Sequence, residues 1–124
     1  MTTTTIMTAV AVNANGDNFN PVKLTLAAAT TRVSVTAVWT LAQSDNIPVV
    51  EFATLPVDLI IDSRLARSMQ AAEHSPVSAN RGADLGVPVY STSYPEVPRG
   101  GYLYAWLNIP SGVYGTVTVI INEI

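Results

Sequence analysis

Hydrophobic and polar residues alternate almost without interruption between Arg32 and Leu41, a segment that reads RVSVTAVWTL. Its odd-numbered positions are all apolar, whereas most of its even-numbered positions are polar. Only an extended strand points successive residues to opposite faces, so the pattern predicts a half-buried β-strand. The apolar residues expected to face the core are Val33, Val35, Ala37, Trp39 and Leu41.

Further strands follow from similar apolar or alternating runs bounded by Gly, Pro and Asn. They are expected at residues 6–12, 22–26, 47–54, 57–61, 87–91, 102–109 and 116–123. The last two are expected to form a hairpin, because the loop at 110–115 contains two glycines. Seven or eight short strands separated by turn signals predict an all-β fold, an antiparallel β-sandwich, and eight strands would allow a jelly roll. The order of the strands stays open.

One segment has a helical period instead. Leu65, Met69 and Ala72 are spaced i, i+4 and i+7, and Asp62 or Ser63 is suited to cap the first turn. We therefore expect a short helix at 62–73, either as a lid over one end of the sheets or as part of a subunit contact. A long loop is expected to follow at 74–86.

The length of 124 residues predicts one domain, with a flexible N-terminal arm at residues 1–5 and a single β-sandwich domain at 6–124. Charged residues make up 12% of the chain, about half the usual share, while hydrophobic residues make up 48%. Either a partner covers much of the surface, or that surface is built from uncharged polar residues such as threonine. The absence of cysteine excludes disulfides and thiolate metal sites.

Charge and hydropathy also limit the partners. A formal net charge of -3 and scattered basic residues argue against nucleic-acid binding. No apolar run approaches the length of about 20 residues that a transmembrane helix needs. The first twelve residues lack the positive charge and continuous apolar core of a signal peptide. Neither a nucleic-acid nor a membrane partner is expected.

The sharpest candidate surface is a row of aromatic residues, Tyr102, Tyr104 and Trp106, at alternate positions of one expected strand. The other face of that strand is aliphatic and is the natural core face, which leaves the aromatic row outside. An exposed row of this kind binds sugars by stacking or lies in a protein interface. The alternatives are that the row faces the core or that the helix covers it.

The C-terminal strand is apolar on both faces. Ile120 and Ile124 share a face with Thr116 and Thr118, opposite the second apolar set. This pattern is typical of a strand covered on both sides, by a second layer or by another subunit. A final strand central to its own sheet would also explain it.

Residues that could perform chemistry are few. His74 is the single histidine, and no G-x-S-x-G nucleophile motif is present. Asp58, Asp62, Glu73 and His74 flank the expected helix and could offer metal ligands, but their spacing does not require a metal. We therefore expect a protein that is not an enzyme, with no catalytic, cofactor-binding or metal-binding residues.

The arm at residues 1–5 and the closing hairpin at 102–123 resemble small phage virion structural proteins of the capsid decoration, or cement, type. The resemblance implies a homo-oligomer, such as a trimer, that binds a larger capsid or tail protein and stabilises the particle without a cofactor. It also implies synthesis in a host cytoplasm followed by incorporation into the virion. The alternative is a lectin-like, carbohydrate-binding β-sandwich module that uses the aromatic row. Tyr102, Tyr104, Trp106, Ile120 and Ile124 are the candidate interface or ligand residues under either interpretation.

Overall fold

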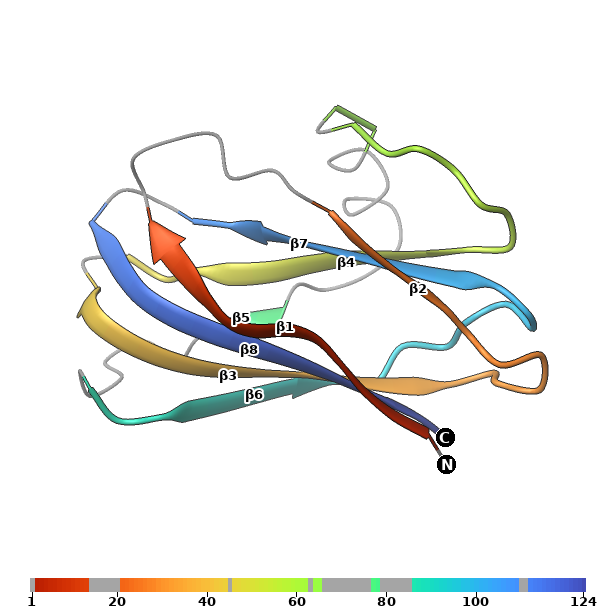
Figure 1. Cartoon of the computed structure of the whole chain (residues 1–124), viewed down its shortest axis with the longest axis horizontal. Helices are drawn as coiled ribbons and strands as arrows, with labels where there is room; N and C mark the ends of the chain where they lie inside the picture. The colour runs from red at the N-terminus through yellow and green to blue at the C-terminus, as the bar shows by residue number, and fades with distance from the viewer. Residues whose placement is uncertain are drawn as a thin grey trace.

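A computed structural model describes residues 2–13, 21–44, 46–62, 64–65, 77–78, 86–109 and 112–124. This part of the chain is all β and forms a sandwich of two antiparallel sheets (Figure 1). The strands are β1 (Thr2–Asn13), β2 (Val22–Thr25), β3 (Val33–Ser44), β4 (Val49–Leu55), β5 (Val77–Ser78), β6 (Val89–Ser93), β7 (Tyr102–Asn108) and β8 (Val113–Glu123). The expected fold class is confirmed.

The order of the strands is that of a jelly roll. Sheet A runs β1-β8-β3-β6, and sheet B runs β2-β7-β4-β5. Among the described strands, the first therefore pairs with the last, the second with the seventh, the third with the sixth and the fourth with the fifth. A long hairpin folded over on itself has this arrangement, which is the jelly roll that the strand number allowed. The two ends of the chain consequently lie side by side (Figure 1).

The core between the sheets is built by the alternation seen in the sequence. The five apolar residues expected on the inner face of β3 are all buried, and so are Val117, Val119 and Ile121 of β8. From sheet B, Phe52, Leu103 and Ala105 pack against them. Because β8 lies between β1 and β3, the two-sided apolar pattern belongs to a central strand.

The described part of the expected arm is a paired strand. Thr2–Thr5 oppose residues 123–120 of β8 in regular antiparallel register. The polarity of four consecutive threonines suggested a loose tail, but β-branched residues suit an extended strand. The ordered sheet therefore begins at Thr2, four residues earlier than the expected strand.

Two other expectations are corrected. Residues 102–109 and 116–123 do not form a hairpin, because β7 pairs within sheet B and β8 within sheet A. Gly112 lies in the connection that crosses between the sheets, whereas Gly115 lies within β8. Residues 57–61 are not a strand either, and they follow Pro56 away from the end of β4.

The helix expected at 62–73 cannot be assessed as a whole, because residue 63 and residues 66–73 lie outside the described residues. Asp62 does accept a hydrogen bond from the main-chain nitrogen of Leu65 at 2.8 Å, the contact expected of a capping residue. Within the part of the chain described, no helical segment has the length and hydropathy that crossing a bilayer requires.

Candidate functional site

The aromatic row lies on the outer face of sheet B, as its alternation with aliphatic residues predicts. Leu103 and Ala105 of β7 are in the core, so Tyr102, Tyr104 and Trp106 point the other way. The row is nevertheless not open to solvent. Tyr104 is 3% exposed and Trp106 is 2% exposed, while Tyr102 is half-buried. The expected surface row is therefore a second, smaller hydrophobic cluster.

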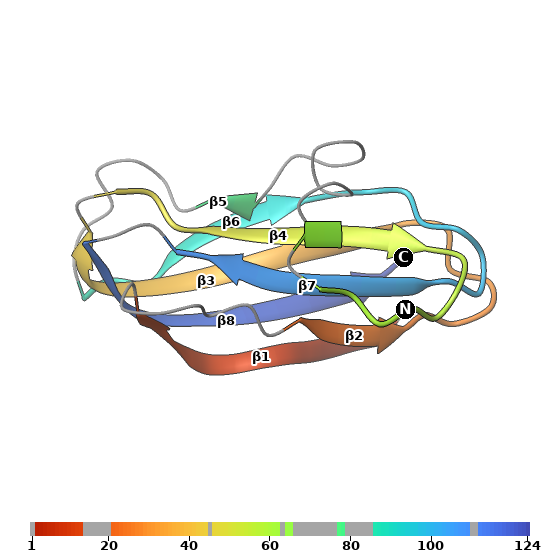
Figure 2. The ribbon, with the colours of Figure 1, turned by 90° about the horizontal axis from the view of Figure 1, so that it is seen from above.

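In the described part of the chain, residues 56–62 lie over this cluster, and we call them the strap. After β4 the strap turns back across the outer face of sheet B, and Ile61 packs with Ala53, Tyr104 and Trp106. In Figure 2 the segment leaves the end of β4 and returns beside β7. Burying one isoleucine in this way contributes about 1.5–3 kcal/mol. The apolar run at 57–61 thus reflects packing on a face rather than pairing in a sheet.

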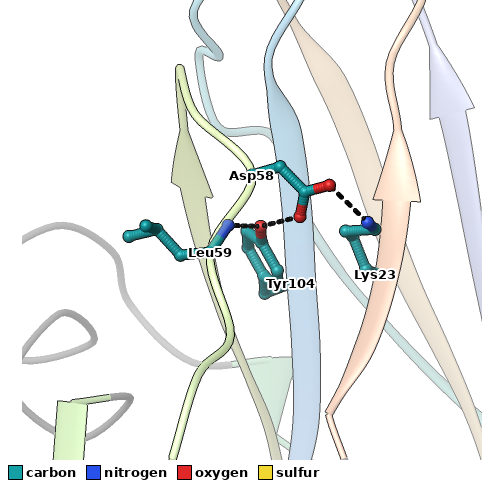
Figure 3. Close-up of polar contacts among 4 residues, drawn as sticks. All are labelled: Lys23, Asp58, Leu59 and Tyr104. Atoms are coloured by element: carbon teal, nitrogen blue, oxygen red, sulfur yellow. Dashed lines mark hydrogen bonds and ion pairs between the residues drawn. The ribbon is translucent and has the colours of Figure 1, made fainter.

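Polar contacts anchor the strap to two strands of sheet B (Figure 3). Asp58 accepts a hydrogen bond from Lys23 of β2, with the carboxylate oxygen and Nζ 2.8 Å apart. The Tyr104 hydroxyl donates to the other carboxylate oxygen at 3.3 Å and accepts from the main-chain nitrogen of Leu59 at 2.7 Å. Lys23 and Tyr104 are direct partners across β2 and β7, which explains why one carboxylate reaches both.

The ion pair shifts both of its groups. The hydrogen bond from Lys23 lowers the pKa of Asp58 below its ordinary 3.8, and the hydrogen bond to Asp58 raises the pKa of Lys23 above 10.5. Partial desolvation opposes both shifts. Because the two side chains remain well exposed, water and salt screen the pair, and it orients the strap more than it stabilises the fold.

Replacing Asp58 with asparagine is expected to lower the stability slightly and only in the middle of the pH range. The contribution of Asp58 is present above its unfolded pKa and is lost as the pH falls through the lower folded value. That of Lys23 is present below its unfolded pKa and is lost as the pH rises through the higher folded value.

Urea unfolding at a series of pH values would measure this difference between the wild type and Asp58→Asn. Glu96→Gln is a matched control, because Glu96 pairs with Arg32 on the surface without holding the strap. A difference that stayed undiminished at the lowest pH, where the Asp58 carboxylate is protonated in both states, would contradict the assignment to the ion pair.

A buried carboxylate lies beside the aromatic cluster. Glu51 of β4 is opposite Trp106 and accepts a hydrogen bond from its indole nitrogen at 3.1 Å. Its other oxygen accepts from the Asn108 amide at 2.6 Å. Both carboxylate oxygens are thereby used to fix the orientation of β7 side chains. The sequence pattern did not identify Glu51 as a site residue, because a single glutamate in a strand is normally expected to point into solvent.

The outward side of the strap is apolar. Ile60 is 99% exposed and Val57 and Leu59 are exposed as well, and Leu65 is exposed three residues beyond the strap. These four are among nine large hydrophobic residues that are exposed in the described part of the chain, and they fall within nine consecutive positions. Such concentration over residues 57–65 is typical of an interaction surface, because exposed apolar residues are scattered singly on most proteins.

The remaining candidates do not join this surface. Ile120 is half-buried on the outer face of sheet A, and Ile124 is exposed at the end of β8. Glu73 and His74 lie outside the described residues. In the ranges that the structure covers, no three residues of the types His, Cys, Asp and Glu gather as metal ligands would. Asp58 instead anchors the strap through Lys23, and Asp62 accepts the capping hydrogen bond from Leu65.

No known protein-family model matches this sequence, and a comparison with curated proteins finds no relative.

Proposed function

We propose that this protein is a non-enzymatic structural subunit of a protein assembly, in which the apolar strap is buried against neighbouring subunits. The specific class that we propose is a phage virion component of the decoration or tail-associated type, which binds copies of itself and a larger capsid or tail protein. The single observation that carries the proposal is the exposure of Val57, Leu59 and Ile60 on the anchored strap.

The anchoring favours a ready-made contact surface. Ile61 packs inward and Asp58 is held by Lys23 and Tyr104, so the outward residues keep their positions before any partner arrives. A surface that is already ordered loses less conformational entropy on binding. With 12% charged residues in the whole chain, little electrostatic repulsion opposes association.

Jelly rolls occur both in viral capsid proteins and in lectins, so the fold alone does not choose between the two functions. The candidate site favours assembly. A sugar platform needs exposed ring faces, whereas Tyr104 and Trp106 are buried beneath the strap. No separate observation supports the carbohydrate-binding alternative.

Self-association of the purified protein tests the proposal, because the strap then has only other copies to contact. We expect size-exclusion chromatography with light scattering to give a mass above the 13.2 kDa of one chain, rising with concentration. Ile60→Asp should weaken the association about tenfold or more, since burying an isoleucine contributes about 1.5–3 kcal/mol and 1.4 kcal/mol is a factor of ten.

Val87→Asp is the matched control, because Val87 is exposed but lies outside the strap. It should leave the mass unchanged. A wild-type mass of one chain at every concentration would contradict the proposal, and binding on a glycan array would then favour the carbohydrate-binding alternative.

A further inference from the structure

The four described edge strands of the sandwich differ in how they are protected against pairing with another chain. On sheet B, β2 begins directly after Pro21 and carries Lys23, and β5 has two residues. On sheet A, β6 has five residues and lies between two prolines. Lysine, proline and short length are the usual devices that prevent edge-to-edge pairing. Strand β1 has twelve residues and contains neither a proline nor a charged residue. Figure 2 shows it as the outermost strand on its side.

The direction of the main-chain groups of β1 follows from contacts at the other side of β8. The Ile124 nitrogen donates to the Arg32 carbonyl at 3.0 Å, so the main-chain groups of Ile124 point toward β3. The main-chain groups of successive residues point to alternate sides of an antiparallel strand. The N–H and C=O groups of residues 123 and 121 therefore point toward β1, while those of 122 and 120 point toward β3. Val33 is opposite Glu123, and its nitrogen donates to the Pro95 carbonyl rather than to β8, as this alternation requires.

Register then separates the residues of β1 into two sets. Thr2 and Thr4 are opposite residues 123 and 121, so their main-chain groups bond to β8. Thr3 and Thr5 are opposite residues 122 and 120, so their N–H and C=O groups point to the free edge. The register shifts after Thr5 and Ala9 has a φ of 45°, which ends the regular segment.

We propose that this edge pairs antiparallel with the same edge of a second copy of the chain, with Thr3 of each copy opposite Thr5 of the other. Each Thr3–Thr5 pair would exchange two main-chain hydrogen bonds, and the two four-stranded A sheets would become one continuous sheet. The inference rests on the proposed function and deepens it, because it names a contact of the same assembly that is separate from the strap.

A second copy fits this edge for reasons of symmetry and charge. Antiparallel pairing of one strand with itself obeys a two-fold axis, so each contact occurs twice. No charged side chain of β1 faces its copy, and the carboxylate of Glu123, opposite Thr2, is buried and accepts hydrogen bonds from the Ala27 nitrogen and the Thr30 hydroxyl. Ile120 lies beside Thr5 on the outer face and adds apolar surface near the seam.

The decisive variant is Thr5→Pro, compared with Thr5→Val. Proline removes the outward N–H of residue 5 but no hydrogen bond to β8, and it suits an edge strand. Valine keeps that N–H and the shape of threonine while it removes the hydroxyl. We expect Thr5→Pro to raise the dissociation constant for self-association at least tenfold by light scattering, while Thr5→Val leaves it unchanged. Circular dichroism melting would establish that both variants are folded.

The strap variant distinguishes the two proposals. If Thr5→Pro and Thr3→Pro both associate like the wild type while Ile60→Asp does not, the edge contact is wrong and the proposed function stands. If the edge variants weaken association and Ile60→Asp does not, the inference is supported and the role of the strap is wrong. A wild-type protein that never associates would overturn both.

Discussion

Replacing Gly115 with alanine is expected to cost more than about 4 kcal/mol, a large part of the roughly 5–15 kcal/mol by which domains are typically stable. Gly115 lies in the middle of sheet A, opposite Val12 of β1 and Leu41 of β3, with a φ of 145° that disfavours any side chain. An added Cβ would collide with the Thr40 carbonyl oxygen and lie 2.7 Å from the Leu41 Cα. These are backbone atoms of a buried strand, so neither can yield without moving β3.

Gly100→Ala separates this collision from the general cost of placing alanine at positive φ. Gly100 has a φ of 63° and nothing within 4 Å of an added Cβ, so its replacement should cost about 1–2 kcal/mol. Urea unfolding followed by circular dichroism measures both variants. Equal losses for the two glycines would contradict the steric explanation.

Replacing Trp39 with alanine is expected to cost about 3–5 kcal/mol. Trp39 is fully buried at the centre of the core, and its indole nitrogen donates to the Ser91 hydroxyl of the neighbouring strand at 3.1 Å. The substitution therefore leaves a large cavity between the sheets and also removes a cross-strand bond. The midpoint of urea unfolding should fall sharply.

Tyr90→Ala is the control for the loss of an aromatic residue from the same region. Tyr90 is opposite Val38 on the outer face of sheet A and is 67% exposed. Its removal should change the stability by no more than about 0.5 kcal/mol. If Trp39→Ala cost as little, Trp39 would not be the core residue that the fold requires.

The inner faces of the strands could be predicted because they depend on local periodicity. The odd-numbered residues from 33 to 41, and Leu103 and Ala105 of β7, are buried as their alternation indicates. Each of these assignments needs only that neighbouring residues point to opposite faces of one strand. The fold class follows from the number and spacing of such strands.

The pairing of strands could not be predicted, because it depends on residues far apart in the chain. Gly112 and Gly115 are typical of a hairpin loop, but here Gly112 belongs to a crossing between the sheets and Gly115 is paired within β8. Likewise, nothing in the threonines at residues 2–5 indicates that their partners lie at the other end of the chain.

The candidate site was predicted in part. Alternation placed Tyr104 and Trp106 on the outer face correctly, but the cover formed by the strap is a tertiary contact that no local pattern specifies. The apolar run at 57–61 fits a buried strand as well as a strap with one face packed. The bonds of Glu51 to Trp106 and Asn108 depend on the register of β4 against β7, which the sequence does not reveal.

The position of β8 between β1 and β3 has a consequence for how the protein is synthesised. The ribosome makes β1, β3 and β6 before β8, the strand that lies between β1 and β3. Until β8 emerges, β1 has no neighbour in sheet A, and its uncharged, threonine-rich edges are open to other nascent chains. Pairing between such distant segments is also slow, because loop closure precedes every stabilising contact. We therefore expect sheet A to form only after β8 has left the ribosome, and expression at low temperature or with chaperones to increase the yield of native protein.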